Sequence, residues 1–386
     1  MLVTCGEHVS ALAAVRELRA AGFVPFVAAT EPRSLAARSR ATAGVAIVPD
    51  ARRDERGFAT AVAAAAEKVS AAAVLPGSEL ALVVLSKHRE LLPAGCALGA
   101  ASEEAVELAT DKGRLARLAA DAGLRAPAGR LVHAGQSVLA SSGLRFPAVV
   151  KPVRSAVCAA DGGRGHVPPT IVHSSAELAS ALRTLPNARG LVQPYLEGPL
   201  HSVAGLAWDG RLLRSVHAVA ERIWPRGCGS LTSAVTVPPD PELDRAVARL
   251  LGKTGWNGIF QLDLIVHDGE PYLLDLNPRL YTSLAIARAA GADLVASWVR
   301  LLLGGDPGEP RPYRSEARYR YETRDLAALL AEARDGRPLT MLGGLLPRRG
   351  TVHAVFDVRD PLPLLAELRR IRPAERRRRR AVREGR

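Results

Sequence analysis

Short apolar runs alternate with amphipathic segments over the first hundred residues. Runs at 2–4, 23–29, 45–49 and 72–75 predict strands, and apolar residues at helical spacing predict helices over 9–21, 58–69 and 79–92. Strands alternating with helices are typical of a parallel α/β layer. The turn Thr4-Cys5-Gly6-Glu7 lacks the G-x-G-x-x-G sequence of dinucleotide-binding folds. We therefore expect the layer without a dinucleotide site.

The pattern changes after Ser102, where two helices are predicted over 103–109 and 113–122. An apolar strand then ends at Lys151, and a long loop that contains Gly162 and Gly163 follows it. Glycines let backbone N–H groups wrap closely around a phosphate. The segments expected next are a helix at 175–183, a strand at 191–194, a hairpin of 201–207 with 212–219, a loop at 222–232 and a helix at 241–254. In that loop, Arg222 and Arg226 are expected either to contact an anionic substrate or to be solvated.

Residues 256–279 predict a second hairpin, with Asp268-Gly269 at its turn. Polar residues interrupt its apolar strands at Asp263, Asp275, Asn277 and Arg279, and the last three share one face because strands have a period of two. An odd number of loop residues would bring Asp263 to the same face, so this hypothesis requires an odd loop. Two carboxylates and an amide oxygen suit a hard cation such as Mg²⁺. The alternative is a solvated hairpin face.

A chain of 386 residues with 48% hydrophobic and 24% charged residues predicts a globular protein of two to three domains. Its apolar runs are too short to span a bilayer, and its start lacks an export signal. The four cysteines are scattered without metal-ligand spacing. We therefore expect a cytoplasmic protein with free thiols, without a membrane span or a zinc site.

The net charge of +13 is concentrated at the C-terminus. Residues 369–386 hold ten arginines and two glutamates, a net charge of +8. The simplest interpretation is a solvated, disordered tail, and the alternative is an electrostatic arm for nucleic acid, an acidic partner or a membrane surface. The tail has no interleaved aromatic residue, which disfavours base stacking and makes nucleic acid the distant alternative.

Several of these weak signals occur in a fixed order along the chain: Pro76-Gly77-Ser78-Glu79, Asp111-Lys112, 147–152, 193–198, Asp263 and 275–279. In that order the chain resembles, over residues 1 to about 305, the ATP-grasp superfamily, in particular its ATP-dependent carboxylate-amine ligases. The resemblance implies an α/β fold that is α+β in the ligase core, with a parallel N-terminal layer before two β-rich subdomains. The domains expected are 1–107, an ATP-grasp domain at 108–306 with a lid at about 128–198, a small α+β appendage at 307–368 and the tail.

The resemblance also implies ATP and Mg²⁺ as cofactors, with Mn²⁺ as the alternative ion. By this resemblance, Lys112 and Lys151 would neutralise the nucleotide phosphates. The backbone of the segment that contains Gln193, Tyr195 and Leu196 would recognise adenine. Glu197 would contact the ribose hydroxyls. Asp263, Asp275 and Asn277 would hold Mg²⁺ between the β- and γ-phosphates. Arg279 would steady the carboxylate or acyl-phosphate.

The implied activity is ATP-dependent coupling of a small-molecule carboxylate to an amine through an acyl-phosphate. An ATP-grasp carboxylase, a kinase and a non-catalytic ATP-binding protein remain alternatives. Two departures weaken the match, because Asp275 stands where the family often has glutamate and Pro199-Leu200-His201 replaces a glutamate after the hinge. The appendage at 307–368 is expected to contain strands at 317–322 and 352–358 and helices at 325–334 and 362–369. Its expected role is either to complete the acceptor pocket or to form a homodimer.

Overall fold

The computed structural model describes the chain except residues 135–143, 154–155, 159–163, 347 and 370–386. Its N-terminal part is the predicted parallel layer, a five-stranded sheet of order β3-β2-β1-β4-β5. The strands are β1 (Leu2–Val3), β2 (Phe26–Ala29), β3 (Gly44–Ile47), β4 (Ala73–Leu75) and β5 (Ala97–Leu98). The helices are α1 (Val9–Ala20), α2 (Glu55–Lys68) and α3 (Glu79–Lys87). The strand order reverses between β1 and β4, so the turns after these two strands lie side by side.

Two helices, α4 (Glu103–Thr110) and α5 (Lys112–Asp121), lead out of this layer. Asp111 separates them, and its carboxylate caps α5 by accepting from the backbone N–H groups of Gly113 and Arg114. An N-cap aspartate fixes where a helix begins. Lys112 is therefore held at the first position of α5.

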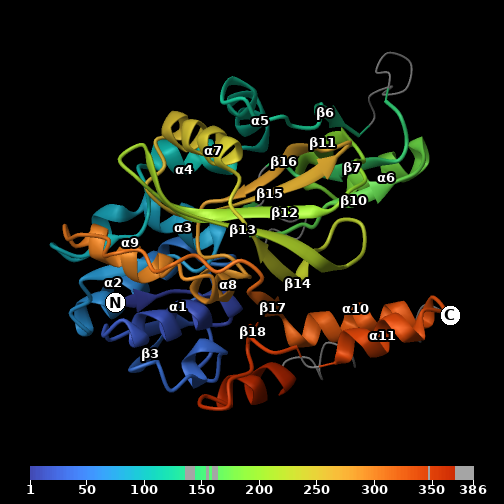
Figure 1. Cartoon of the computed structure of the whole chain (residues 1–386). Coiled ribbons are helices and arrows are strands. Elements are labelled where there is room, and N and C mark those ends of the chain that lie inside the picture. The colour runs from blue at the N-terminus through green and yellow to red at the C-terminus, as the bar shows by residue number, and fades with distance from the viewer. Residues whose placement is uncertain (135–143, 154–155, 159–163, 347, 370–386) are drawn as a thin grey trace, which may run out of the picture.

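An antiparallel sheet of order β10-β7-β11-β6 follows (Figure 1). Its elements are β6 (Arg130–His133), β7 (Ala148–Lys151), β10 (Thr170–Val172), α6 (Ser175–Arg183) and β11 (Arg189–Pro194). Its apolar side chains form a hydrophobic cluster of their own. The loop expected after β7 also contains a small hairpin of β8 (Ala156–Cys158) and β9 (Arg164–His166), which the sequence analysis did not predict. Gly162 and Gly163 lie outside the described residues.

The largest sheet has seven strands in the order β16-β15-β12-β13-β14-β17-β18. They are β12 (Leu200–Trp208), β13 (Arg211–Trp224), β14 (Ser230–Val237), β15 (Gly258–His267), β16 (Glu270–Asn277), β17 (Arg318–Arg320) and β18 (Thr351–His353). The prediction of a loop at 222–232 is wrong, because these residues form the end of the β13–β14 hairpin. Thr232, Ser233 and Thr236 are all buried, so β14 shows no alternation of apolar and polar residues.

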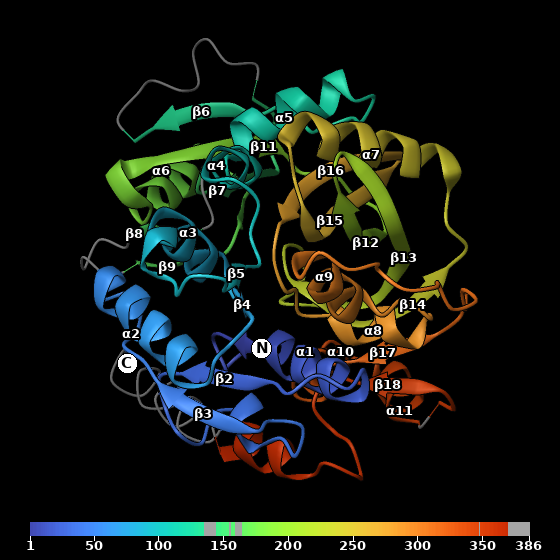
Figure 2. The ribbon, with the colours of Figure 1, turned by 90° about the vertical axis from the view of Figure 1, so that its left-hand side faces the viewer.

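The remaining helices pack around this sheet: α7 (Pro241–Thr254), α8 (Leu284–Ala289), α9 (Leu294–Leu302), α10 (Glu322–Arg334), α11 (Pro338–Leu345) and a helix at 362–369. Figure 2 shows α1 of the N-terminal layer beside α8 and α9. The buried Glu17 of α1 ties these elements together by accepting from the N–H groups of Val295 and Ala296 at 2.7 and 3.0 Å. The segment predicted as an appendage contributes β17 and β18 to the large sheet. No helix in the described part of the chain is long and apolar enough to cross a membrane.

Candidate active site

The candidate site is built on the β15–β16 hairpin, whose turn is Asp268-Gly269. The odd loop required by the hypothesis is wrong, because the loop has two residues. The strands nevertheless change register between Asp263 and Leu264, so that Asp263 pairs with Asp275 and Leu264 with Leu273. This β-bulge inserts Leu274 as an extra residue and supplies the shift that an odd loop would have supplied. Asp263 and Asp275 therefore lie directly opposite each other.

Asn277 and Arg279 continue the same face. The Asn277 amide donates from Nδ2 to Asp263 Oδ2 at 3.1 Å, and its Oδ1 accepts from Arg279 Nη2 at 2.8 Å. A second Arg279 nitrogen, Nη1, donates to the Leu280 carbonyl at 3.0 Å. The Arg279 Nε is buried and has no hydrogen-bond partner among the described residues. The four polar residues of the hairpin thus form one connected cluster that keeps an unused donor.

Two lysines from other elements reach this cluster. Lys112, at the start of α5, forms an ion pair with Asp275 and is almost completely buried. Lys151, at the end of β7, donates from Nζ to the carbonyl of Leu274 at 2.9 Å. The bulge thus provides an acceptor for one lysine and a carboxylate beside the other. Residues far apart in sequence converge here.

The charges of the cluster shift its pKa values in opposite directions. Burial and then the Asp275 charge raise the pKa of Asp263 to about 7. Burial also acts to raise the pKa of Asp275, but Lys112, Lys151 and Arg279 outweigh it and the net shift is downward. Burial and the neighbouring Lys112 lower the pKa of Lys151 to about 8. The Asp275 carboxylate is thus compensated by protein cations, whereas the Asp263 carboxylate has no such compensation.

This donor set fits a hard divalent cation. Two opposed carboxylates repel each other, and a cation between them would relieve the repulsion. The described residues contain no group of three or more His, Cys, Asp or Glu side chains that could hold a metal, and the third oxygen donor beside the two carboxylates is the amide of Asn277. That oxygen accepts one hydrogen bond, from Arg279 Nη2 at 2.8 Å, and an amide oxygen has a second lone pair.

The predicted adenine-reading segment begins in the last residues of β11 and continues beyond it. The Gln193 side chain is buried and donates to the Pro127 carbonyl at 3.1 Å, while the Tyr195 N–H donates to the Pro147 carbonyl at 3.1 Å. Leu196 is half-buried and Glu197 is exposed. At Gly198 the chain presses against β15, because an added Cβ would lie 1.9 Å from the Val266 carbonyl oxygen. The segment is therefore a tight connection between the two antiparallel sheets.

Comparison with solved structures places this arrangement among known folds. An L-amino acid ligase from Bacillus licheniformis superposes with a TM-score of 0.59 at 16% identity, covering 81% of this chain and 74% of the other. A biotin carboxylase from Campylobacter jejuni gives a TM-score of 0.62 at 16% identity, with 82% and 74% covered. The family model for "ATP-grasp in the biosynthetic pathway with Ter operon" matches residues 187–325. The chain has an ATP-grasp fold. The resemblance inferred from the ordered motifs is thereby confirmed.

Curated relatives of this chain are longer proteins. The carbamoyl phosphate synthase large chain of Gemmatimonas aurantiaca is 29% identical over 233 residues, which are 57% of this chain and 20% of that protein. The corresponding protein of Kocuria rhizophila is 28% identical over 218 residues, 53% and 19% of the two chains. The matches therefore span about a fifth of the length of these relatives.

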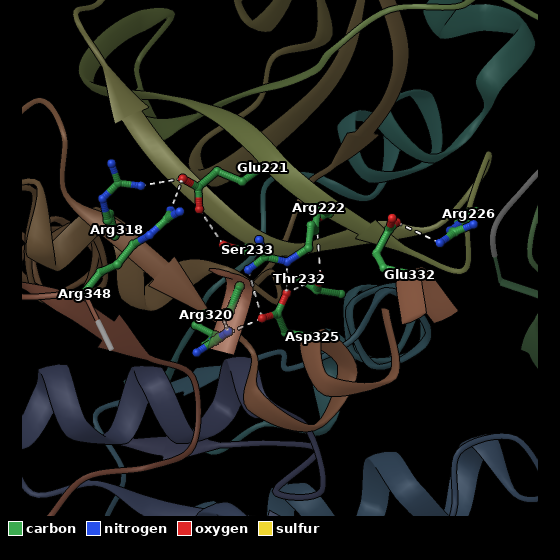
Figure 3. A network of polar contacts seen from close by, with 11 residues as sticks. Glu221, Arg222, Arg226, Thr232, Ser233, Arg318, Arg320, Asp325, Glu332 and Arg348 are labelled. Atoms are coloured by element: carbon green, nitrogen blue, oxygen red, sulfur yellow. Dashed lines mark hydrogen bonds and ion pairs between the residues drawn. The ribbon is translucent and has the colours of Figure 1, made fainter. Parts of the chain in front are cut away.

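Arg222 and Arg226, for which anionic substrate and solvent were the expected partners, form ion pairs with α10 (Figure 3). Arg222 binds both oxygens of the completely buried Asp325, from Nε at 2.7 Å and from Nη2 at 3.0 Å. Arg320 donates to the same carboxylate at 2.6 Å. Arg226 pairs with Glu332 at 2.7 Å. Arg222 is held by the buried Asp325 and is not the solvated arginine that was one expectation, whereas Arg226 is exposed as well as paired. The predicted loop is a hairpin end that packs on α10.

Two cysteines near the cluster were not predicted. Burial raises the pKa of Cys228, in the β13–β14 connection, and the nearby Lys151 charge opposes this shift. Cys5 follows β1 with a φ of 56°, and its thiol donates to the Ser78 hydroxyl at 3.3 Å. Arg279 lies close enough to lower its pKa against the larger effect of burial. The motif containing Ser78 marked this edge in the sequence, whereas nothing local marked Cys228.

Proposed function

We propose that the protein is an ATP- and Mg²⁺-dependent carboxylate-amine ligase. The observation that carries this proposal is the cluster of Asp263, Asp275, Asn277 and Arg279, faced by Lys112 and Lys151. Transfer of a phosphoryl group depends mainly on positioning and on neutralising phosphate oxygens. A cluster that combines carboxylates for a metal with buried cations for phosphates meets both needs.

The metal would be held by Asp263, Asp275 and Asn277, with Mg²⁺ as the first choice and Mn²⁺ as the alternative. When bound, the ion supplies charge neutralisation between the β- and γ-phosphates. Lys112 and Lys151 would then bind phosphate oxygens, Lys112 by leaving Asp275 and Lys151 by leaving the Leu274 carbonyl. Their burial supports this exchange, because a cation and an anion attract each other more strongly where water is excluded.

The rest of the nucleotide would lie along the connection between the sheets. Adenine would be read through the backbone of the segment that contains Gln193, Tyr195 and Leu196, since the Gln193 side chain is used internally. Glu197 is exposed and available for the ribose hydroxyls. We propose that Gly162 and Gly163 belong to a lid at about 128–198 and contact the phosphates.

The chemical step proposed begins with attack by a substrate carboxylate oxygen on the γ-phosphorus of ATP, with ADP as leaving group. The amine nitrogen then attacks the acyl carbon, phosphate leaves, and the amine proton is released. Arg279 would hold the carboxylate and then the acyl-phosphate, and its unpaired, buried Nε supports this role because a bound oxygen would satisfy it. Closure of the lid would exclude water from the acyl-phosphate.

The comparisons support ligase chemistry and keep one alternative open. The L-amino acid ligase is named for joining amino acids, and the neighbour named biotin carboxylase represents the carboxylase alternative. We propose a small-molecule carboxylate and an amine as substrates. We also propose that the protein works in the cytoplasm and that it can form a homodimer. The division into 1–107, 108–306, 307–368 and 369–386 remains part of this proposal.

The test is ADP release with Mg²⁺ over paired amino acids and small carboxylates. Release is expected only when both a carboxylate and an amine are present, and hydroxylamine should trap a hydroxamate when the amine is omitted. A stable phosphorylated product would indicate a kinase, and turnover that depends on bicarbonate would indicate a carboxylase. Tight ATP binding without ADP release across the panel would contradict the ligase and favour a binding protein.

A further inference from the structure

The tip of the β13–β14 hairpin touches two parts of the chain that lie far apart in sequence. The last pair of this ladder is Trp224 with Ser230, so residues 225–229 form the hairpin tip. The tip is folded closely on itself, because a Cβ added at Gly229 would lie 2.0 Å from the Pro225 carbonyl oxygen. The five residues of the hairpin tip therefore form one compact unit.

On one side the hairpin tip packs against the antiparallel sheet β10-β7-β11-β6, the lid sheet, which lies within the proposed lid. The backbone of Gly227 rests on the Ile171 side chain of β10, since an added Cβ would lie 2.4 Å from Ile171 Cδ1. β10 pairs with β7, and β7 ends at Lys151. Cys228 lies close enough to Lys151 and to Tyr195 to affect the pKa of both groups. The hairpin tip thus borders two residues of the proposed nucleotide site.

On the other side the hairpin tip is bound to the end of α10 by charge. Arg226, the one charged residue in the sequence of the tip, pairs through Nη2 with Glu332 at 2.7 Å (Figure 3). Its Nη1 pairs with Asp335. The base of the same hairpin is held by Arg222, which pairs with the buried Asp325 of α10. A buried ion pair therefore fixes the base of the hairpin, and exposed ion pairs fix its tip.

A second arginine shares the carboxylates that hold the hairpin tip. Arg337 pairs with Glu332 at 2.5 Å and with Asp335 at 3.6 Å, but it lies in the connection between α10 and α11 and not on the hairpin. Removal of Arg226 would therefore leave both carboxylates with a cation. Exposed ion pairs contribute little to the stability of a fold. The effect of the Arg226 pairs is to set the position of the hairpin tip.

We propose that Arg226 is a positioning residue for the nucleotide, because it holds the hairpin tip between α10 and the lid sheet. The inference rests on the proposed function, since the residues that the tip borders are those expected to bind ATP. A tip that is held gives the lid sheet a fixed surface, and it keeps Lys151 near the charge of Asp275. Without the Arg226 pairs the tip would take several positions. The arrangement that binds ATP would then be only fractionally populated, and the apparent affinity would fall by that fraction.

The test is the affinity of the full chain for a fluorescent ATP analogue in the presence of Mg²⁺. Arg226→Ala should bind the analogue about tenfold more weakly, because the binding arrangement is less populated. Glu332→Ala/Asp335→Ala removes the same anchor from α10 and should weaken binding to a similar extent. The matched control is Arg337→Ala, which takes an arginine from the same two carboxylates without touching the tip and should bind like wild type. Arg226→Lys should restore part of the affinity, since lysine keeps the charge but has one nitrogen.

A second measurement follows the hairpin tip directly. Alkylation of Cys228 by iodoacetamide, followed by mass spectrometry, should be severalfold faster in Arg226→Ala than in wild type. The reason is that Cys228 is half-buried, and a tip that is no longer held exposes the thiol more often. Unchanged unfolding midpoints in urea would separate this local effect from a loss of global stability.

Equal ATP affinity of Arg226→Ala and wild type would overturn the inference and leave the proposed function intact. Weak binding by Arg226→Ala together with normal binding by the α10 double variant would also overturn it, because Arg226 would then contact the nucleotide itself. A wild-type protein that binds no ATP analogue with Mg²⁺ would refute the proposed function and this inference with it.

Discussion

Replacing Asp263 with asparagine should stabilise the ligand-free protein at alkaline pH. Burial and the opposed Asp275 raise the pKa of Asp263 from 3.8 to about 7 in the folded protein. In the unfolded chain the carboxyl ionises near its ordinary pKa. Folding at pH 8 therefore carries the cost of keeping a poorly compensated charge, and the neutral amide of the Asp263→Asn variant would not carry that charge.

The magnitude follows from this difference in pKa. One pH unit corresponds to about 1.4 kcal/mol, so the full effect is about 4 kcal/mol above pH 7. We expect about 2–4 kcal/mol of added stability at pH 8, because the side chain is not fully cut off from water. The gain is absent below pH 4, where the carboxyl is protonated in both states, and grows as pH rises from 4 to 7. It should therefore shrink by more than half between pH 8 and pH 5.

The assay is urea unfolding without nucleotide or metal at pH 5 and pH 8. Asp325→Asn is the matched control, because Asp325 is completely buried but held by Arg222 and Arg320. Removing its charge leaves two arginines uncompensated and should destabilise the protein by about 3–5 kcal/mol. Stabilisation by Mg²⁺ and ATP should also disappear in Asp263→Asn. A destabilised Asp263→Asn protein at pH 8 would refute the reasoning and make this carboxylate a structural acceptor.

Three other changes test the site and the tail. Asp275→Ala should abolish Mg²⁺-dependent ADP release while the fold is retained, since it removes a metal ligand; unchanged release would eliminate the metal assignment. ATP affinity, measured by titration with a fluorescent analogue, should fall as the pH rises above about 8, because Lys151 loses its proton there. The variant Lys151→Arg should bind ATP with no such pH dependence, since arginine stays protonated. An identical pH profile in the variant and the wild type would contradict this role of Lys151. Deletion of residues 373–386 should leave turnover unchanged and abolish low-salt retention on polyanions; salt-resistant, sequence-selective DNA binding by the intact chain would instead favour the nucleic-acid alternative.

Coupling between α10 and the ATP-grasp core depends on compensated charge. Asp325 receives hydrogen bonds from Arg222, Arg320 and Thr232, which belong to three neighbouring strands of the large sheet. The hairpin that carries Arg222 continues to Cys228, which lies close enough to Lys151 for each group to affect the pKa of the other. α10 and the proposed nucleotide site are thus both in contact with the β13–β14 hairpin.

The sequence by itself determined the elements whose signals are local. The strands of the N-terminal layer, the hairpin of 201–207 with 212–219 and the helix at 113–122 all form within a few residues of their predicted positions. Each depends on residues within a few positions of one another, so propensity and capping decide it. The even spacing of Asp275 and Asn277 likewise fixed their shared face. The sequence did not predict β14, because its polar residues are buried and do not alternate with apolar ones.

Only the tertiary structure decided how the site is assembled. The bulge at Leu274, which places Asp263 opposite Asp275, depends on pairing between two strands, and no local pattern shows which residue will be extra. Lys112 and Lys151 find their partners across more than a hundred residues, as Arg222 does with Asp325. Charge compensation depends on distance in space, and the folded chain alone sets which charges meet.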